Sequence, residues 1–320
     1  MHRYLWVQRL VGAGEEVGRM TLNQLRIFEA VARHCHFTRA AEELYLSQPS
    51  VSVQVRELEK ECGLPLLTQQ GKRVYLTDEG RLLADYAVRV LALVADAQAA
   101  MAEARDLSSG RLHVGASTTV ATYVLPRLLG LYKARHPGIA IHLISGNSEE
   151  IQRRLVRNEL DFGLVEGATI LPDLVAEPYM DDELVPIVAP SDPLVTAASG
   201  AGAGLLMGAT FILREPGSGT REVMEAALRA AGVQPLGTME LGSTEAIKRA
   251  VAAGLGMSLV SRYALDLDIA AGLLVVPDLP WLRARRTFQL VRHPRKRLSR
   301  AAAAFHTLLL AHRDAELGVT

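Results

Sequence analysis

The chain has 320 residues, of which 49% are hydrophobic and 22% are charged, and 35 basic side chains balance 35 acidic ones. This length predicts two or three domains, and the composition is that of an ordinary globular protein. The balanced charge excludes a protein that binds nucleic acid through its overall charge, so any such contact requires a local patch. The sequence holds two cysteines, Cys35 and Cys62. They provide no disulfide framework and no zinc-ligand spacing, and they fit a reducing cytosol.

The first 19 residues carry a short apolar patch that is soon followed by Glu15 and Glu16. A signal peptide needs a longer apolar core than this, and no apolar run in the chain approaches the roughly 20 residues that span a bilayer. We therefore expect residues 1–19 to be a disordered extension or an upstream start. We also expect the protein to work in the cytoplasm without a membrane contact.

The part of the chain after Met20 is predicted to form three helices. Leu22, Leu25 and Phe28 recur at the three- and four-residue spacing of one helix face. Thr38 can cap a second, short helix, and after a tight turn at Leu46 and Ser47 a third helix follows. A proline in the first turn of that helix costs little, because the missing N–H has no partner there. Three helices with a sharp turn before the third form a helix-turn-helix pattern.

The third helix has two unlike faces. Val51, Val55 and Leu58 share one face and would pack on the first two helices, whereas the other face carries short polar groups. Such groups suit base edges and phosphates, although a polar face in solvent gives the same pattern. The next segment, around QQGK, alternates as a β-hairpin does, with Lys72 and Arg73 placed to contact a sugar-phosphate backbone.

The run FTRAAEELYLSQPSVSVQVRELEKECGLPLL, followed by VYLTDEG, resembles the winged helix-turn-helix of LysR-type transcriptional regulators, and the resemblance covers residues 20–106. It implies that the domain over residues 20–77 binds double-stranded DNA. The side chains expected at the DNA are Thr38, Arg39, Gln48, Pro49, Ser50, Ser52, Val53, Gln54, Arg56, Lys72 and Arg73. Two features depart from the family pattern and bear on the bases that are read. Many relatives carry an arginine in place of Val53, and an aromatic and then basic residues in place of Leu67, Gln69 and Gln70.

A long helix is predicted from Thr77 to about Arg105, because two acids follow the capping threonine and no proline or glycine interrupts it after Gly80. Its apolar residues step by four and three, the pattern of a coiled-coil seam. They are Leu83, Ala87, Val90, Val94, Ala97 and Met101. We expect the helix over residues 78–106 to form a homodimer for a two-fold symmetric promoter site, with residues 107–111 as a hinge. The family resemblance adds a tetramer, and a single helix packed on the following domain is the alternative.

The remainder contains a diverged internal repeat that reads β-α-β-α-β twice. The first copy runs from LHVGA to DFGLV and the second from TFILR to GMSLV, and the loops GNSEEI (146–151) and GSTEAI (242–247) match closely. Each copy predicts a parallel sheet with helices on its faces. The fold class is therefore α/β, with an effector domain over residues 112–310. Its two lobes are expected at about 112–185 with 266–310, and at 186–265.

Every strand-to-helix junction in this half is rich in hydroxyl groups. In open α/β sheets such junctions gather where ligands bind, and helix amino-termini there attract anions. The stretch REPGSGTREVM (214–224) fits an enzyme's phosphate loop, an anion sensor or a helix cap, and its match with STTV in the first copy favours the sensor. The predicted effector contacts are Ser117, Thr118, Thr119, Gly146, Asn147, Ser148, Glu166, Arg214, Ser218, Gly219, Thr220, Ser243 and Thr244.

Arg214 and Arg221 flank the glycine loop and leave two interpretations open. They can grip an anion through forked hydrogen bonds, or form salt bridges with the nearby Glu215, Glu222 or Glu225. The later basic run WLRARRTFQLVRHPRKRLSR is expected to contain a strand, a turn and a capped helix start, with its charges in solvent.

The second half is similar to the two-lobed effector domain of LysR-type regulators, which resembles type 2 periplasmic binding proteins. Within the family, GASTTVATYVLPRLL, REPGSGTRE and LGSTEAIKRAVAAGLGMSLVS look most like regulators of sulfur assimilation and of carbon fixation. The resemblance implies a transcription factor that responds to a small anionic effector, such as a sulfur oxyanion, a phosphorylated metabolite or a carboxylate. RNA polymerase is a further candidate partner.

Two other classes of protein compete with this interpretation. A solute-binding protein of a transporter is suggested by the second half alone, and the winged domain in front of it disfavours that class. An enzyme is disfavoured because REPGSGTRE lacks the glycine-lysine-threonine ending of a nucleotide-binding loop, and because no catalytic, metal or cofactor constellation accompanies it. His113, His136 and His142 are interpreted as structural residues.

Overall fold

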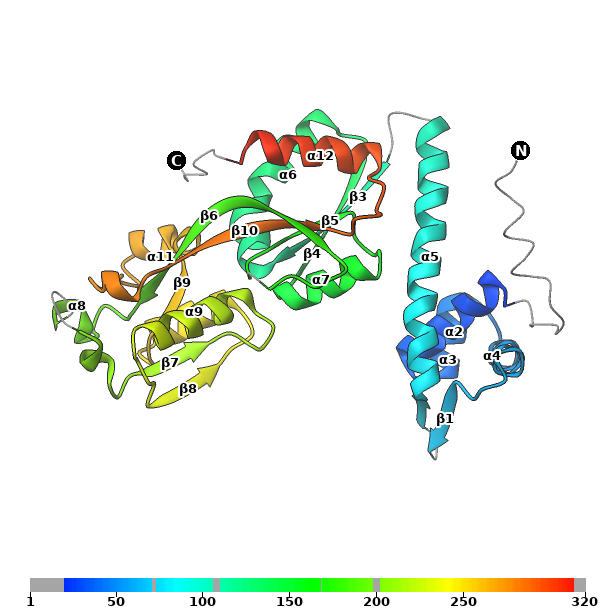
Figure 1. Ribbon diagram of the computed structural model, residues 1–320, viewed down its shortest axis with the longest axis horizontal. Helices are drawn as coiled ribbons and strands as arrows, with labels where there is room; N and C mark the ends of the chain where they lie inside the picture. The colour runs from blue at the N-terminus through cyan, green and yellow to red at the C-terminus, as the bar shows by residue number, and fades with distance from the viewer. Residues whose placement is uncertain (1–19, 71–72, 106–109, 168, 198–201, 314–320) are drawn as a thin grey trace. The chain divides into compact units, whose positions relative to one another are not determined.

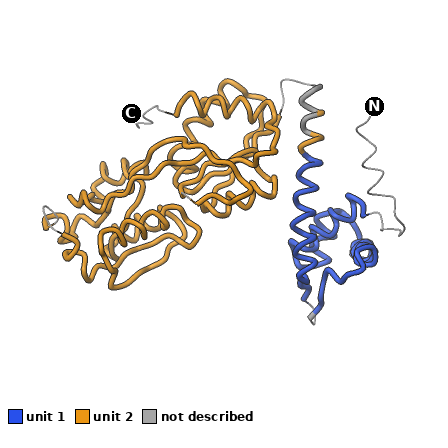
Figure 2. The backbone as a smooth tube through the Cα atoms, in the orientation of Figure 1, with its two compact units in different colours: residues 1–95 blue, residues 96–320 orange. Residues whose placement is uncertain are grey.

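The computed structural model describes residues 20–70, 73–105, 110–167, 169–197 and 202–313, and Figure 1 shows its helices and strands. Contacts between residues divide the chain into two compact units, 1–95 and 96–320 (Figure 2). The boundary falls inside the long helix and not at the expected hinge, 107–111. Most of that hinge segment lies outside the described residues, and Gly110 and Arg111 already belong to a strand. The extension over residues 1–19 lies outside the described residues too.

The first unit contains the predicted three helices, hairpin and long helix. Polar side chains start the helices: Thr21 forms a capping box with Gln24, and the Ser47 hydroxyl accepts a hydrogen bond from the Ser50 N–H at 3.2 Å. Tyr45, in a left-handed conformation, makes the tight turn before the third helix. The elements are α2 (Leu22–His34), α3 (Phe37–Leu44), α4 (Gln48–Cys62), β1 (Leu67–Gln70), β2 (Arg73–Leu76) and α5 (Asp78–Arg105).

The prediction that Thr38 caps the second helix is wrong. Helix α3 begins at Phe37, and Nδ1 of His36 accepts the hydrogen bond from the Arg39 N–H at 3.4 Å. Cys35 ends α2 in a left-handed conformation, so the chain turns back at once and Phe37 packs on the core as part of α3. Thr38 therefore lies exposed in the first turn of that helix.

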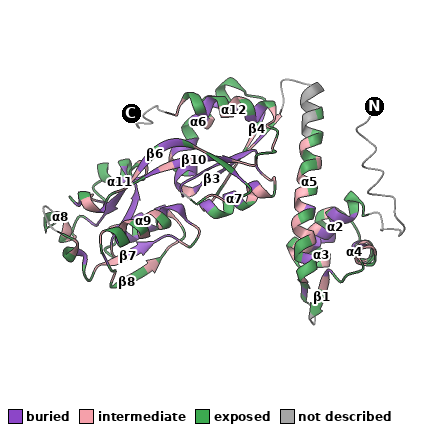
Figure 3. Ribbon diagram, in the orientation of Figure 1, coloured by how far each residue is buried: buried purple, intermediate pink, exposed green. Residues whose placement is uncertain are grey.

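The core of the first unit lies where the three helices meet. Val51, Val55 and Leu58 of α4 are at most 2% exposed, which confirms the predicted inner face, and Figure 3 maps burial over the whole chain. Gly80 allows α5 to pass close to the strand entry, because a Cβ at this position would lie 1.9 Å from the carbonyl oxygen of Leu66. The close approach leaves no room for any other residue type at this position.

Helix α5 starts as predicted but buries its apolar residues unevenly. The Thr77 hydroxyl accepts a hydrogen bond from the Gly80 N–H at 2.9 Å and so caps the helix. Leu83 packs against the core of the unit and Ala87 is fully buried, so these two side chains are not available to a partner helix, contrary to the predicted seam. The large apolar side chains of α5 that stay exposed are Leu82, Tyr86, Val90, Leu93 and Met101. No helix among the described residues is long and apolar enough to cross a membrane.

The first lobe of the second unit is the first copy of the repeat. It contains β3 (Gly110–Ser117), a π-helical turn η1 (Val120–Val124), α6 (Leu125–Arg135), β4 (Ile139–Gly146), α7 (Ser148–Val156) and β5 (Phe162–Val165). β3 pairs in parallel with β4 and with β5, as predicted. Leu112, Val114 and Ala116 share one face of β3 and are fully buried, and Gly115 and Ser117 on its other face are buried too, as expected for a parallel strand covered on both faces.

The second lobe repeats the arrangement. It contains α8 (Leu194–Ala197), η2 (Ala203–Leu206), β7 (Thr210–Leu213), α9 (Gly219–Ala230), β8 (Gly237–Glu240), α10 (Thr244–Ala252), β9 (Ser258–Ser261), η3 (Arg262–Ala264), α11 (Asp266–Ala270) and η4 (Pro280–Leu282). β7 pairs in parallel with β8, and a parallel bridge joins Phe211 to Met257 just before β9. The repeat inferred from the sequence is therefore confirmed in both lobes.

Two long strands, β6 (Val175–Ile187) and β10 (Ala284–Arg292), run from one lobe to the other (Figure 1). They pair antiparallel within a six-stranded sheet of order β4-β3-β5-β10-β6-β9, so they belong to both lobes and form the hinge between them. After β10, helix α12 (Arg300–Ala311) lies on the first lobe, and its Phe305 fills the core of that lobe.

The lobe boundary predicted at residue 266 is wrong. Residues 266–282 remain in the second lobe, because Leu274, Leu279 and Leu282 fill its two hydrophobic clusters. The chain returns to the first lobe only along β10, once these side chains have completed the second core.

Candidate functional site

The carboxyl ends of the strands in both lobes meet helix starts that are capped by predicted site residues. Asn147 Oδ1 accepts a hydrogen bond from the Glu150 N–H at 2.9 Å, and Ser243 Oγ accepts one from the Ala246 N–H at 3.1 Å. Ser218 caps α9 in the same way. The two matching loops, GNSEEI and GSTEAI, thus start equivalent helices, one in each lobe. The place where the two lobes meet is called the junction of the lobes.

A buried carboxylate, Glu166, follows β5 and bonds to the starts of helices from both lobes. Its Oε1 accepts from the Thr119 N–H at 3.0 Å, and its Oε2 accepts from the Thr220 hydroxyl at 2.5 Å and from Arg286 Nη1 at 3.0 Å. Burial raises the pKa of this carboxyl group, but the charge of Arg286 and the hydrogen bonds from Thr220 and Thr119 outweigh it and hold the pKa at about 2. Glu166 is therefore an ionised group of the protein itself at the place predicted for an anion.

Arg286 joins Glu166 to the hinge strands. Its Nε donates to Asp182 Oδ2 at 2.7 Å, and the Ser261 hydroxyl donates to the other oxygen of Asp182 at 2.8 Å. Burial raises the pKa of Asp182 above its usual range, against the opposing effect of Arg286. The expectation that the charges of the late basic run lie in solvent is wrong for Arg286, whose side chain is 3% exposed.

Sequence reasoning missed both Arg286 and Asp182, although a signal was present. Arg286, Phe288 and Leu290 are spaced by two along β10 and are all buried. Alternate residues of a strand share one face of the sheet, so the pattern places Arg286 on the same inward face as two apolar side chains. A charge on such a face needs a buried partner.

Arg214, at the end of β7, is a second buried arginine at the junction, with 2% of its side chain exposed. Its Nη2 donates to the Thr118 hydroxyl of the first lobe at 3.2 Å, and its Nη1 donates to the Thr244 hydroxyl of the second lobe at 3.4 Å. Glu215 receives both Nε and Nη2 at 2.8 Å, so the predicted salt bridge is present. The guanidinium group therefore holds hydroxyl groups of both lobes while a neighbouring carboxylate balances its charge.

Arg221 is committed to contacts within the second lobe. Its guanidinium group pairs with Glu225 and Glu240, each at 2.8 Å, and donates to the carbonyl oxygen of Arg214 at 2.9 Å. The salt-bridge interpretation is thus confirmed for Arg221. Its hydrogen bond to the Arg214 carbonyl oxygen also helps to position the Arg214 backbone.

Further polar contacts join the lobes at the edges of the junction. The Tyr123 hydroxyl donates to Glu245, which also pairs with Lys248 at 2.7 Å. On the other side the Glu149 N–H donates to the carbonyl oxygen of Gly217 at 3.2 Å. Gly219 lies so close to the first lobe that a Cβ on it would stand 2.4 Å from the backbone nitrogen of Gly167. These contacts are polar, and water or a ligand can replace their hydrogen bonds when the lobes separate.

The remaining predicted residues also lie at this junction. Ser117 ends β3 and is buried, Gly146 accepts a hydrogen bond from the Thr118 hydroxyl at 3.2 Å, and the Ser148 hydroxyl accepts one from the Glu166 N–H at 3.2 Å. The structure therefore brings the predicted effector residues together, but several of them already bond to Glu166. No group of three or more His, Cys, Asp and Glu side chains among the described residues is arranged to hold a metal ion.

The outer face of α4 in the first unit carries most of the predicted DNA contacts. Gln48, Pro49, Ser50 and Arg56 are exposed, and Val53 is 47% exposed. The side chains least accessible on this face are the half-buried Ser52 and Gln54. Thr38 and Arg39 at the start of α3, and Arg73 on β2, are also exposed, whereas Lys72 lies outside the described residues.

Several of these polar groups are held by neighbours on the same helix. Arg56 Nη2 donates to the Ser52 hydroxyl at 2.9 Å, and Gln54 Nε2 donates to Glu57 Oε2 at 2.9 Å. Weak contacts between exposed side chains on one helix are easily exchanged for a ligand. The face can therefore present donors and acceptors to base edges in a major groove.

Comparison with known families identifies both units. Residues 22–81 match the bacterial regulatory helix-turn-helix protein of the lysR family, and residues 105–314 match the LysR substrate binding domain. The chain belongs to the LysR family of transcriptional regulators. It is therefore a DNA-binding regulator with an effector-binding domain, and the predicted fold class and family are confirmed.

Similar LysR-type proteins share nearly the whole chain. The RuBisCO operon transcriptional regulator of Allochromatium vinosum is 39% identical over 292 residues, 91% of this chain and 96% of that protein. The regulator CbbR of Rhodospirillum rubrum is 39% identical over 294 residues, again 91% and 96%. These relatives are transcriptional regulators and not transport proteins, which argues against the alternative of a solute-binding protein.

Solved structures agree with the fold. The CcmR regulatory domain of Synechocystis, in complex with 2-PG, superposes with a TM-score of 0.59 at 33% identity, over 65% of this chain and 99% of that one. Full-length OxyR of Pseudomonas aeruginosa superposes with a TM-score of 0.65 at 26% identity, over 92% and 94%. The second comparison spans both units of the LysR architecture.

Proposed function

We propose that this LysR-family regulator binds a small anion at Arg214, between the two lobes, and controls genes of carbon assimilation. The observation that carries the proposal is the buried Arg214 guanidinium, which bonds to Thr118 of one lobe and Thr244 of the other. A fork of donors flanked by two hydroxyl groups is suited to a carboxylate or a phosphate. No enzymatic step is part of this function.

Glu215 acts as the exchangeable counterion in this proposal. Its side chain is 26% exposed, whereas Arg214 is 2% exposed, so the carboxylate can swing into solvent while the arginine stays in place. An arriving anion replaces Glu215 on the guanidinium and gains the hydrogen bonds of Thr118 and Thr244. Glu166 is held by Arg286 and remains bound, so it is a fixed part of the site and not the group that leaves.

Anion binding in this position biases the angle between the lobes. The ligand contacts Arg214 and Thr244 on the second lobe and Thr118 on the first. It makes all three contacts only when the lobes are close, so it stabilises the closed arrangement by its differential affinity. The change in the angle between the lobes takes place at the hinge strands β6 and β10.

The relatives support the choice of genes and ligand. Proteins 39% identical to this chain are regulators of a RuBisCO operon, and a regulatory domain 33% identical to it was solved with 2-PG. For the output, we propose that two copies pair through the exposed apolar residues of α5 and present two α4 helices to a two-fold symmetric site. Such a regulator works where the chromosome is, in the cytoplasm.

Fluorescence anisotropy tests the proposal. The full chain is titrated onto labelled DNA from the region upstream of its own gene, at fixed moderate salt, with and without 2-phosphoglycolate, a small anion that carries both a phosphate and a carboxylate. We expect tighter binding than to scrambled DNA of equal length and a change in affinity when the anion is added. Equal binding to both DNAs would refute the regulator's DNA role, and indifference to 2-phosphoglycolate, inorganic phosphate and sulfate would refute the anion site.

A further inference from the structure

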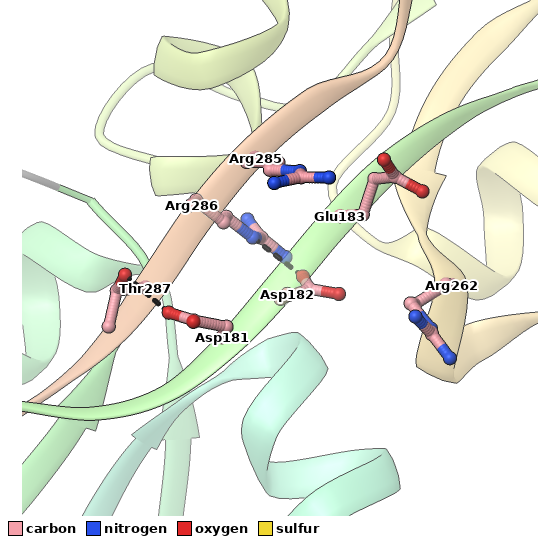
Figure 4. A pocket seen from close by; sticks show the side chains of 7 residues that line it. All are labelled: Asp181, Asp182, Glu183, Arg262, Arg285, Arg286 and Thr287. Carbon is pink, nitrogen blue, oxygen red and sulfur yellow. Dashed lines mark hydrogen bonds and ion pairs between the residues drawn. The ribbon is translucent and has the colours of Figure 1, made fainter. Parts of the chain in front are cut away.

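A pocket lies at the hinge strands, and the residues predicted to bind the effector do not line it. Its volume is about 450 Å³, and side chains from β6, from β10 and from the start of η3 line it (Figure 4). All of its lining residues are polar or charged, and none of the predicted effector residues is among them. The volume is within the range of small-molecule sites, which is roughly 300 to 1,000 Å³. A wall without apolar residues favours a strongly polar occupant.

The acids of the pocket are mostly engaged. Asp182 is bonded to Arg286 and to Ser261, and Asp181 Oδ1 accepts a hydrogen bond from the Thr287 hydroxyl at 2.8 Å. Both aspartates are on β6, and these contacts tie them to the neighbouring strands β10 and β9. Figure 4 shows Asp182 facing Arg286 across the two strands.

Two arginines of the pocket have no acidic partner. Arg262 and Arg285 are exposed, and within the described residues neither guanidinium group forms an ion pair or a hydrogen bond. Arg286 lines the same pocket, and its Nη2 is buried without a hydrogen-bond partner among the described residues. A buried donor that lacks a partner calls for an explanation, and so do free positive charges gathered in one hollow.

We propose that this hinge pocket binds a small phosphate ester that also carries hydroxyl groups. β6 lies between β10 and β9, so Glu183, the register partner of Arg285, separates Arg285 from Arg262. The phosphate binds the forked donors of Arg285, and the hydroxylated end of the ligand extends past Glu183 to Arg262. Asp181 and Glu183 line the pocket too, and their carboxylates accept hydrogen bonds from the hydroxyl groups of the ligand. A bare anion satisfies the arginines but leaves these acids facing it, so the mixed lining selects for a hydroxylated phosphate over an inorganic one.

The pocket is positioned to influence the proposed effector cleft, which is the site of Arg214, Thr118 and Thr244 between the lobes. Arg285 is on a hinge strand, whereas Arg262 directly follows β9 of the second lobe, so one ligand held by both fixes that lobe against the hinge. Arg286 then connects the pocket wall to Glu166 and Thr220 at the junction of the lobes. Two ligands that favour the same lobe angle raise each other's affinity by the same factor.

Calorimetric titration of the full chain with glycerol 3-phosphate tests the proposal, with inorganic phosphate and glycerol as comparison ligands. The variant Arg262→Gln/Arg285→Gln should bind glycerol 3-phosphate at least tenfold more weakly at one site, since each charge-assisted contact is worth about a factor of ten. The matched control Arg229→Gln removes an exposed arginine from α9, which contributes nothing to the pocket, and should bind as the wild type does. Inorganic phosphate should bind more weakly than glycerol 3-phosphate, and glycerol should give no heat.

A cleft variant separates this pocket from the proposed effector site. Thr118→Ala/Thr244→Ala removes hydroxyl groups of the cleft, and we expect it to keep the hinge-site affinity for glycerol 3-phosphate. The proposal is overturned if the double arginine variant, folded as judged by circular dichroism, binds like the wild type. It is also overturned if the cleft variant abolishes every binding event, because the ligand would then occupy the cleft alone.

Discussion

Arg286 and Glu166 are 120 residues apart in the sequence and form an ion pair of 3.0 Å in which both side chains are at most 3% exposed. Removing one partner of such a pair leaves an uncompensated buried charge, which costs about 3 to 5 kcal/mol. We expect Arg286→Met to destabilise the second unit by this amount, because it leaves the buried Glu166 carboxylate without its cation. The substitution also removes the Arg286 partner of Asp182. Urea unfolding followed by the fluorescence of Trp281, which lies in η4 of the second lobe, measures the change.

Two further variants show whether the loss comes from the pair. Arg283→Met makes the same substitution directly before the strand, at a side chain 3.7 Å from Glu183, and should change stability by less than about 0.5 kcal/mol. Adding Glu166→Gln to Arg286→Met should recover part of the stability, because a neutral amide replaces the stranded carboxylate. A double variant as unstable as the sum of the single ones would contradict the coupling.

The low pKa of Glu166 predicts a dependence of stability on pH. Its folded-state pKa of about 2 is below the unfolded value, so the unfolded chain binds the proton first as the pH falls. The contribution of Glu166 is then fully present above about pH 5 and is lost as the pH falls toward 2. Burial raises the pKa of Asp182, so this residue acts in the opposite direction and reduces the net slope of the unfolding free energy against pH.

Comparing wild type and Glu166→Gln isolates this contribution. Unfolding free energies measured by urea at intervals from pH 6 to pH 3 should converge for the two proteins as the solution becomes acidic. The difference at pH 6 is expected to be about 3 kcal/mol, in line with 1.36 kcal/mol for each unit of pKa shift. A constant difference across this range would show that the glutamine disturbs packing and that ionisation is not the cause.

The sequence predicted local features of the fold well because their causes are local. Asn147, Ser218 and Ser243 each cap the helix that follows them, and a cap needs only the backbone of the next turn. The internal repeat was found by the same means, since the two copies carry the same caps at the same places. Even so, His36 replaced Thr38 as a cap, because the core contact of Phe37 decides where α3 begins.

Features that depend on distant partners were missed. Nothing near Arg286 in the sequence reveals that it meets Glu166, and nothing near Leu83 reveals that the winged domain covers it. For Arg214, the sequence allowed both a salt bridge and an anion grip, and the structure shows how one residue can serve both. The Glu215 carboxylate accepts hydrogen bonds from the Arg214 guanidinium, and the hydroxyl groups of Thr118 and Thr244, one from each lobe, accept from the same guanidinium.

Glu215→Gln should strengthen anion binding in the cleft. The substitution removes the internal carboxylate that competes for Arg214, and the affinity for 2-phosphoglycolate should rise about tenfold, the value of one charge-assisted contact. Arg214→Lys keeps the charge but loses the fork, and should lower the affinity by a similar factor. Calorimetric titration of the full chain measures both.

A matched control removes the same charge elsewhere in the lobe. Glu225→Gln disrupts the pair with Arg221 on α9 and should leave the affinity within about twofold of the wild type. If Glu225→Gln strengthens binding as much as Glu215→Gln does, general electrostatics and not displacement of the counterion would explain the effect.

The exposed apolar residues of α5 predict a dimer that a single charge can weaken. Leu93 is 65% exposed, and we expect Leu93→Glu to shift the protein from dimer to monomer at micromolar concentration, because a carboxylate in an apolar helix interface cannot be solvated. Sedimentation velocity measures the state. Leu236→Glu places the same charge at a 79% exposed leucine of the second lobe and should leave the dimer intact. A dimer that survives Leu93→Glu would place the interface elsewhere.

The outer face of α4 predicts a division of labour at the DNA. Gln48 and Ser50 are exposed at the start of the helix, in the position of groups that read base edges, whereas Arg73 on β2 is expected at a phosphate. Gln48→Ala should lower affinity for the specific site by about 1 to 3 kcal/mol and leave binding to random DNA unchanged. Arg73→Gln should weaken binding to both DNAs equally and reduce the slope of log affinity against log salt by about one.

Anisotropy titrations at four salt concentrations distinguish the effects of Gln48→Ala and Arg73→Gln, and Arg229→Gln, far along the chain on α9, serves as the control for charge. A salt slope that Arg73→Gln leaves unchanged would remove the wing strand from the interface.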